Sequence, residues 1–282
     1  MNLSDIRIVV DSSADGLQMA DLCVRSAPLK IVTDVAQWVD DDTLDVAQMA
    51  ATLATYKGRS GTSCPSMGDF LEAFGDAPYV FCITMTSNLS GTYNVALSAA
   101  REYEELGKGR VHVFDSRNTG GGMRLIAEKI RELLLAGKDF DGIVREVEHY
   151  KGDIELLFLL ESLNNLANNG RVSRTVAKIA GLLGIRLLGR AVDGQVSPVA
   201  KPRGDKKALL TTFAQMEELG YQGGKVRISH CENETGALAA KNLVMEKYPD
   251  ADVQINKMGG LCSFYAERAG LIIGFEIGNE WA

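Results

Sequence analysis

Hydroxyl side chains gather in two short segments of this sequence, and they are the residues best suited to chemistry. One segment is Asn88-Leu89-Ser90-Gly91-Thr92-Tyr93, and the other is Gly61-Thr62-Ser63-Cys64-Pro65-Ser66. Neutral hydroxyls donate hydrogen bonds to an anion without adding a charge of their own. The two segments therefore predict a binding site for a carboxylate or a phosphate group.

The backbone around these hydroxyls strengthens the prediction. Ser90, Gly91 and Thr92 are expected to open a helix, whose N-terminus offers unpaired N–H groups and a partial positive charge. Gly91 permits a close approach of the backbone to a ligand. In the other segment, Ser66 and Asp69 have the spacing of a capping box, which leaves Thr62 and Ser63 available. Ordinary helix capping also explains any one of these turns, because Ser and Thr are common caps.

Alternating strands and helices would bring such turns to one edge of a sheet. The apolar runs at 6–10, 79–85 and 110–114 predict buried strands, and helical patterns cover 44–56, 67–74, 90–106 and 122–136. This alternation indicates a mostly parallel sheet with helices on both faces. Further hydroxyl-rich turns follow the predicted strands, at Asp11-Ser12-Ser13, at 84–87 and at Asp115-Ser116. Open α/β folds bind their ligands at this carboxyl edge of the sheet.

A second α/β pattern begins near residue 153 with the run IELLFLL. The later predictions are helices at 161–168, 174–184, 206–218 and 235–247, and strands at 185–191, 196–200, 225–230, 252–256 and 270–276. Asp193-Gly194 is a hairpin signal between two of these strands. The fold class is therefore α/β with two lobes: a mostly parallel lobe over 1–152 and a second, mixed α/β lobe over 153–282.

Composition excludes several classes of protein. The 282 residues carry 30 Lys and Arg against 37 Asp and Glu, and a net charge of −7 argues against a nucleic-acid binder. No run is apolar over the roughly 18 residues that a transmembrane helix needs. The N-terminus lacks the features of a signal peptide. Five scattered cysteines without metal-ligand spacing favour reduced thiols, a cytoplasmic location and no metal or cofactor.

Two features favour a different class, an enzyme acting on a small phosphorylated or carboxylated metabolite. Gly120-Gly121-Gly122 has the outline of a phosphate-binding loop, although it matches no nucleotide motif, and His230 ends a predicted strand. A tight turn and a packed histidine explain both features as well. No G-x-S-x-G elbow occurs, so no catalytic residue is assigned. An interaction module with an empty cleft is a third alternative.

Five segments, in order, resemble the DegV family, the fatty-acid-binding subunits of bacterial fatty acid kinase systems. The resemblance is carried by the segments 8–15, 61–66 with Asp69-Phe70, 87–93, 113–116 and 169–173. It implies a two-lobe α/β carrier, not an enzyme, with a long-chain fatty acid buried between the lobes. It further implies that hydroxyls at Thr62 and Ser90 hold the carboxylate, and that a separate kinase phosphorylates the bound acid.

The same resemblance assigns further residues and shows one departure. Arg171 and Arg203 are implied to lie near the exposed carboxylate face, toward a kinase partner. The segments 182–185 and 261–264 are candidates for the tunnel wall, with Ile185 and Phe264 among them. The family usually carries a histidine near the C-terminus, and the corresponding stretch Ser263–Gly270 has none. Either the Tyr265 phenol or the Arg268 guanidinium is expected to take its place.

Overall fold

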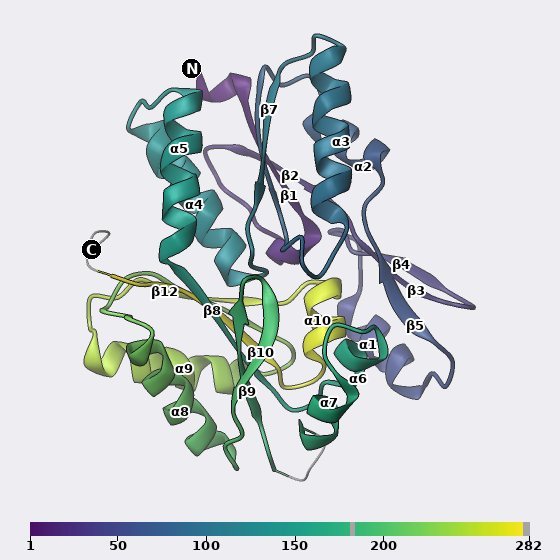
Figure 1. The fold of residues 1–282 in the computed structure, drawn as a ribbon, viewed down its shortest axis with the longest axis vertical. Coiled ribbons are helices and arrows are strands. Elements are labelled where there is room, and N and C mark those ends of the chain that lie inside the picture. Colours follow the sequence, from purple (N-terminus) through teal and green to yellow (C-terminus); the bar gives the residue numbers. More distant parts are fainter. Residues whose placement is uncertain (181–183, 279–282) are drawn as a thin grey trace.

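Two large sheets and a small one organise the computed structural model, which describes residues 1–180 and 184–278 (Figure 1). Sheet A is parallel, in the order β2-β1-β6-β7. Its strands are β1 (Ile6–Asp11), β2 (Cys23–Ala27), β6 (Tyr79–Thr84) and β7 (Arg110–Asp115). Three of these four strands match the predicted apolar runs. The fourth, β2, was not predicted because most of its residues are exposed at the sheet edge.

Helices cover both faces of sheet A, as predicted. Helices α2 (Met67–Phe74) and α3 (Thr92–Glu105) pack on the face that carries Val9, while α4 (Gly121–Leu135) and α5 (Phe140–Tyr150) pack on the face that carries Ile8 (Figure 1). Ser66 and Asp69 form the predicted capping box of α2. Helix α5 was not predicted, although its N-cap Asp139 accepts a hydrogen bond from Gly142 N.

Sheet B corrects the prediction of a turn at residues 61–66. Its three antiparallel strands are β3 (Lys30–Thr33), β4 (Gln37–Val39) and β5 (Ser60–Ser63). Thr62 lies in β5 opposite Ile31. The sequence Ser60–Ser63 lacks the apolar alternation of a strand, so it is the pairing with β3 that stabilises these residues as a strand. Helix α1 (Val46–Thr55) packs beside this sheet.

Sheet C forms the second, mixed part of the fold, in the order β10-β9-β8-β13-β11-β12. Only β11 and β12 run parallel among its described neighbours. The strands are β8 (Ile154–Leu160), β9 (Leu187–Val192), β10 (Gln195–Ala200), β11 (Val226–His230), β12 (Val253–Lys257) and β13 (Leu271–Glu276). Helices α8 (Asp205–Glu218) and α9 (Glu234–Lys247) cover one face, and α4 packs on the other. Helix α4 therefore lies between sheets A and C.

Short helices complete the chain around the place where the sheets meet. They are α6 (Asn164–Asn168), α7 (Arg174–Ala180), α10 (Gly260–Ala266) and the 3-10 turns η1 (Leu3–Asp5), η2 (Ser12–Ala14) and η3 (Lys151–Asp153). The predicted helix 174–184 is seen as α7, and residues 181–183 lie outside the described part. Helix α10 was not predicted. Within the described residues, no helix has the length and apolar character needed to cross a bilayer.

Candidate functional site

A cavity lies at the carboxyl edge of sheet A, where the sequence predicted a ligand site. It contains about 810 Å³ of free space, its opening to solvent included. The loops after β6 and β7 form one side, and β8, the β9–β10 hairpin and α10 form the other. The site is therefore built from both halves of the chain.

Thr62 and Tyr265 meet on the wall of this cavity. The Thr62 Oγ1 atom lies 2.8 Å from the phenolic oxygen of Tyr265, and both residues line the cavity. Thr62 comes from β5 and Tyr265 from α10. The structure thus brings the predicted hydroxyl together with one of the two expected replacements for the family's histidine. The other, Arg268, is exposed and lies 4.0 Å from the Glu232 carboxylate.

Ser90 lines the same cavity and is held by its own turn. Its hydroxyl accepts a hydrogen bond from Thr92 N at 3.3 Å, and lies 2.8 Å from Thr92 Oγ1 and 3.4 Å from Cys64 Sγ. Thr92 is buried, so it supports Ser90 rather than facing the cavity. Gly91 has φ −73° and caps α3, and it does not line the cavity. Ser63 is exposed and also lies outside the lining.

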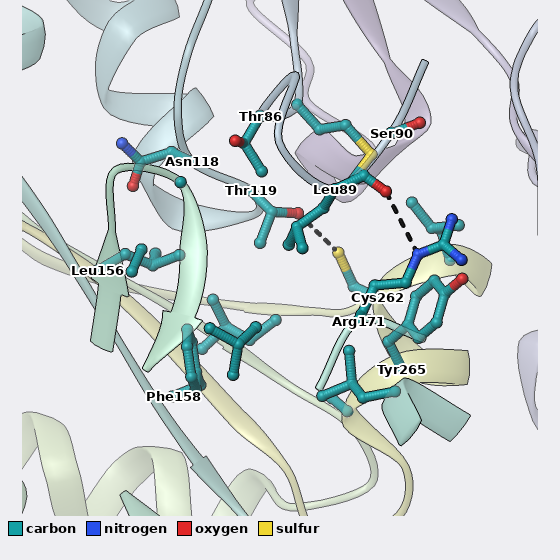
Figure 2. A pocket seen from close by; sticks show the side chains of 18 of the residues that line it. Thr86, Leu89, Ser90, Asn118, Thr119, Leu156, Phe158, Arg171, Cys262 and Tyr265 are labelled. Atoms are coloured by element: carbon teal, nitrogen blue, oxygen red, sulfur yellow. Dashed lines mark hydrogen bonds between the residues drawn. The ribbon is translucent and has the colours of Figure 1, made fainter. Parts of the chain in front are cut away.

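Arg171 supplies a positive charge to the cavity wall. Its Nε donates to Leu89 O at 3.3 Å, and Nη1 donates to Asn169 O. Among the described residues, these carbonyls are its partners, and no carboxylate is within ion-pair distance. Figure 2 shows the guanidinium beside Tyr265, near the turn that carries Ser90. Arg203, in contrast, is exposed and lies outside the cavity lining.

The remaining hydroxyl-rich turns serve the fold. Ser13 Oγ donates to Asp11 Oδ1 at 2.5 Å, and Ser12 Oγ accepts from Leu29 N at 3.1 Å. Ser87 Oγ donates to Asp115 Oδ2 at 2.6 Å, and these five hydroxyl and carboxyl residues do not line the cavity. Turn formation thus explains these five side chains, whereas Thr86 of the 84–87 turn lines the cavity together with Thr62 and Ser90.

The two residues predicted for the apolar wall, Ile185 and Phe264, do not line the cavity. Phe264 packs against Ile31 and Met49, away from the cavity, because it points from α10 toward α1. Ile185 forms a bridge with Arg203 and does not line the cavity. Residues 182 and 183 lie outside the described part of the chain. Of the second candidate segment, Leu261 and Cys262 do face the cavity.

Most of the apolar lining was missed by sequence reasoning. It comes from β8, the β9–β10 hairpin, β13 and the loop after β6, through Leu156, Phe158, Leu160, Ala191, Val196, Ile272, Met85 and Leu89. In β8, Leu156, Phe158 and Leu160 face the cavity, whereas Leu157 and Leu159 face α8 and α9. The run IELLFLL is apolar on both faces, so its pattern gave no signal of which face lines a cavity.

Two buried carboxylates hold α10, and with it Tyr265 and Cys262, against the first half of the chain. Asp15 Oδ1 accepts from Gly259 N at 2.9 Å, and Asp40 accepts from Gly260 N at 2.6 Å and from Leu261 N at 2.9 Å. Burial raises the pKa of Asp15 to about 6 and raises the pKa of Asp40. These two carboxylates therefore hold α10 in place, and with it the part of the cavity wall that carries Tyr265 and Cys262.

The features that favoured a metabolite enzyme do not reach this cavity. A Cβ at Gly121 would lie 2.3 Å from Arg227 O, so this glycine lets α4 pack on sheet C. Gly120 N donates to Ser13 O at 2.8 Å instead of facing a ligand. His230 is buried, its Nδ1 accepts from Asn233 N at 3.2 Å, and burial lowers its pKa. Among the described residues, no group of His, Cys, Asp or Glu side chains is placed to hold a metal ion.

Known proteins share this architecture along nearly their whole length. Residues 5–275 match the family model described as "Uncharacterised protein, DegV family". A DegV domain-containing protein of Streptococcus gordonii is 37% identical over 278 residues, which cover 96% of this chain and 99% of that protein. A DegV family structure from Eubacterium eligens, loaded with heptadecanoic acid, has a TM-score of 0.94 at 41% identity and covers 97% of this chain and 100% of its own. The fatty acid kinase (Fak) B3 protein of Streptococcus pneumoniae, loaded with linoleic acid, has a TM-score of 0.93 at 34% identity, with coverages of 97% and 99%.

Proposed function

This chain belongs to the DegV family, and on that premise we propose that it binds a long-chain fatty acid and presents the carboxylate to a separate kinase. The observation that carries the proposal is the cavity itself. Thr62, Ser90, Arg171 and Tyr265 gather along one part of its wall, and apolar side chains form much of the remainder. The two similar structures that were loaded with fatty acids support this assignment.

The polar residues suit a carboxylate that loses water on binding. A buried carboxylate must keep hydrogen bonds or a positive partner. The Thr62 and Tyr265 hydroxyls already lie 2.8 Å apart, so each can turn its proton toward an oxygen placed beside them. Ser90 adds a third hydroxyl, and Arg171 adds a charge that its two carbonyl partners do not neutralise. Charge-assisted hydrogen bonds of this kind are stronger than neutral ones.

The apolar wall suits the alkyl tail. Leu89 and Cys262 continue from the polar residues toward Leu156 and Phe158 on β8 (Figure 2), and Ile272, the partner of Phe158 on β13, also lines the cavity. Each methylene transferred from water to such a wall contributes about 0.8 kcal/mol. We propose that residues 1–152 and 153–282 act as two lobes, and that the tail lies between them.

The protein would act as a carrier, with the phosphoryl transfer carried out by its partner. The Streptococcus pneumoniae relative is a component of a fatty acid kinase. Arg203 is exposed outside the cavity, so we propose that it contacts the kinase. All five cysteines are free thiols, which agrees with the proposed cytoplasmic location.

Removing two of the hydroxyls tests the proposal. The double variant Thr62→Ala/Ser90→Ala should lower the affinity for hexadecanoic acid by more than roughly tenfold, because the carboxylate loses two donors. The matched control is Thr55→Ala/Ser98→Ala, which removes two exposed hydroxyls outside the cavity lining. Titration calorimetry measures both. Unchanged affinity in a folded Thr62→Ala/Ser90→Ala protein would count against the site.

A further inference from the structure

One aromatic side chain stands out on the cavity face of β8. Leu156, Phe158 and Leu160 alternate along the strand and line the cavity, while Leu157 and Leu159 belong to the core under α8 and α9. This alternation follows from the period of two in a β-strand. Phe158 is the bulkiest of the three lining residues. Figure 2 shows it across the cavity from Tyr265 and Arg171.

Phe158 lies between two neighbours on sheet C that differ greatly in size. Its antiparallel partner on β9 is Gly189, and its partner on β13 is Ile272. A Cβ atom built on Gly189 would lie 2.3 Å from Phe158 Cε2 and 2.8 Å from Cδ2. The ring therefore occupies the space above Gly189 that any other residue would fill.

Gly189 is needed for space and not for an unusual backbone. It is not among the described glycines with positive φ, and it pairs with Phe158 and with Pro198, next to the register shift between Pro198 and Ala200. A side chain at 189 would also lie 3.2 Å from Ser197 O, so β10 offers it no alternative space. A larger residue at this position must move the Phe158 ring, and the cavity that Phe158 lines is the free space beside it.

We propose that Gly189 is a positioning residue that sets the longest alkyl chain the cavity accepts, by holding the Phe158 ring against β9. This inference rests on the proposed function, because it concerns the tail of a ligand whose carboxylate is held near Tyr265. A ring seated in the space over Gly189 leaves room in the cavity for the last carbons of a long chain. A displaced ring takes that room, and each excluded methylene lowers affinity roughly fourfold.

The test is a chain-length profile. Affinities for dodecanoic, tetradecanoic, hexadecanoic and octadecanoic acids are measured by titration calorimetry for the wild type, Gly189→Ala, Phe158→Leu and the double variant. The matched control is Gly152→Ala, where a Cβ meets nothing within 4 Å. Circular dichroism of each variant establishes that it is folded.

Gly189→Ala should weaken octadecanoic acid roughly tenfold or more while changing dodecanoic acid by less than about twofold. Phe158→Leu should bind the long-chain acids with an affinity close to that of the wild type. The double variant should recover long-chain binding, because Leu leaves space for the added methyl group. The control should keep the wild-type profile.

Three results would overturn the inference. Equal loss for all four acids in Gly189→Ala would show a purely structural role, and an unchanged profile would show no role. If Gly189→Ala does not fold, a folded double variant that loses octadecanoic acid binding while Phe158→Leu keeps it would count against the inference, because the smaller Leu side chain at position 158 should have made room for the added methyl group. A wild-type protein that binds none of the acids would instead remove the proposed function itself, and the inference with it.

Discussion

The Tyr265 phenol and the Thr62 hydroxyl lie 2.8 Å apart although 203 positions separate them in the sequence. One comes from the short helix α10 and the other from the edge strand β5 of sheet B. Their meeting depends on the contact of α10 with sheet B and α1, through Phe264, Ile31 and Met49. The proposed head-group site is therefore a product of the tertiary fold and not of any local motif.

Tyr265→Phe should weaken fatty acid binding while leaving the fold intact. The variant keeps the ring and loses only the phenolic donor, and a hydrogen bond to a charged group contributes about 1.5–3 kcal/mol. We therefore expect an affinity loss of roughly tenfold to a hundredfold in calorimetric titration. Tyr56→Phe is the matched control, because the Tyr56 hydroxyl has no hydrogen-bond partner among the residues that the structure describes and does not line the cavity. Equal effects in both variants would contradict the assignment of Tyr265.

Arg171 and Arg203 should differ in their effect on the isolated protein. Arg171→Gln removes the positive charge from the cavity wall, so its affinity for a fatty acid should fall by roughly tenfold. Arg203→Gln changes an exposed side chain outside the lining, and the affinity should stay within about twofold. Displacement of a bound fluorescent fatty acid measures the affinity of both variants. Matching losses would place both residues at the carboxylate, and no loss in Arg171→Gln would leave it a role outside binding.

Asp15 makes folding stability depend on pH. Its pKa is raised to about 6 by burial, so the folded protein holds this proton more tightly than the unfolded chain does. Its contribution to stability is complete below the unfolded pKa near 3.8 and is lost as the pH rises through 6. Asp15→Asn cannot ionise, and its amide oxygen can still accept the hydrogen bond that Gly259 N donates to Asp15 Oδ1. The variant should be more stable than the wild type at pH 7, by up to about 3 kcal/mol.

Urea unfolding of both proteins at pH 4 and pH 7 measures this difference. The advantage of the variant should shrink below about 1 kcal/mol at pH 4, where the wild-type carboxyl is protonated in the folded state. Other carboxylates titrate in both proteins and cancel in the comparison. A difference that stays constant between the two pH values would show that Asp15 is not the responsible group.

Gly121→Ala should destabilise the contact between α4 and sheet C. Its added methyl group would lie 2.3 Å from Arg227 O and 3.0 Å from Gly274 N, which are backbone atoms that cannot move aside cheaply. Overpacking of this kind costs about 1–3 kcal/mol. Gly68→Ala is the matched control in a first helical turn, since its Cβ would make an ordinary 3.6 Å contact. Thermal unfolding should show a lower midpoint for Gly121→Ala alone.

The sequence predicted the parts of this fold whose signals are local. The runs around Val9 and Cys82 are short and apolar, and the Ser66–Asp69 pair needs only its own turn, so strands β1 and β6 and the cap of α2 were found. Strand β5 was missed because Ser60–Ser63 reads as a turn until β3 pairs with it. The side of β8 that lines the cavity could not be predicted either, because Leu157 and Phe158 are equally apolar.

Some of the predicted site residues line the cavity and others do not. Thr62 and Ser90 were named from hydroxyl spacing and family resemblance, and both line the cavity. Ile185 and Phe264 were named from apolar segments, and their side chains lie elsewhere because the turn of α10 and the bridge to Arg203 direct them away from it. Tyr265 was one of two alternatives for the missing histidine, and only the packing of α10 distinguishes it from Arg268.

Mass spectrometry of the organic extract from natively purified protein tests the central claim most directly. The account predicts a long-chain fatty acid at close to one molecule per chain, and its loss from the Thr62→Ala/Ser90→Ala protein purified in the same way. A protein that carries no lipid, and that also fails to take up added hexadecanoic acid, would contradict it.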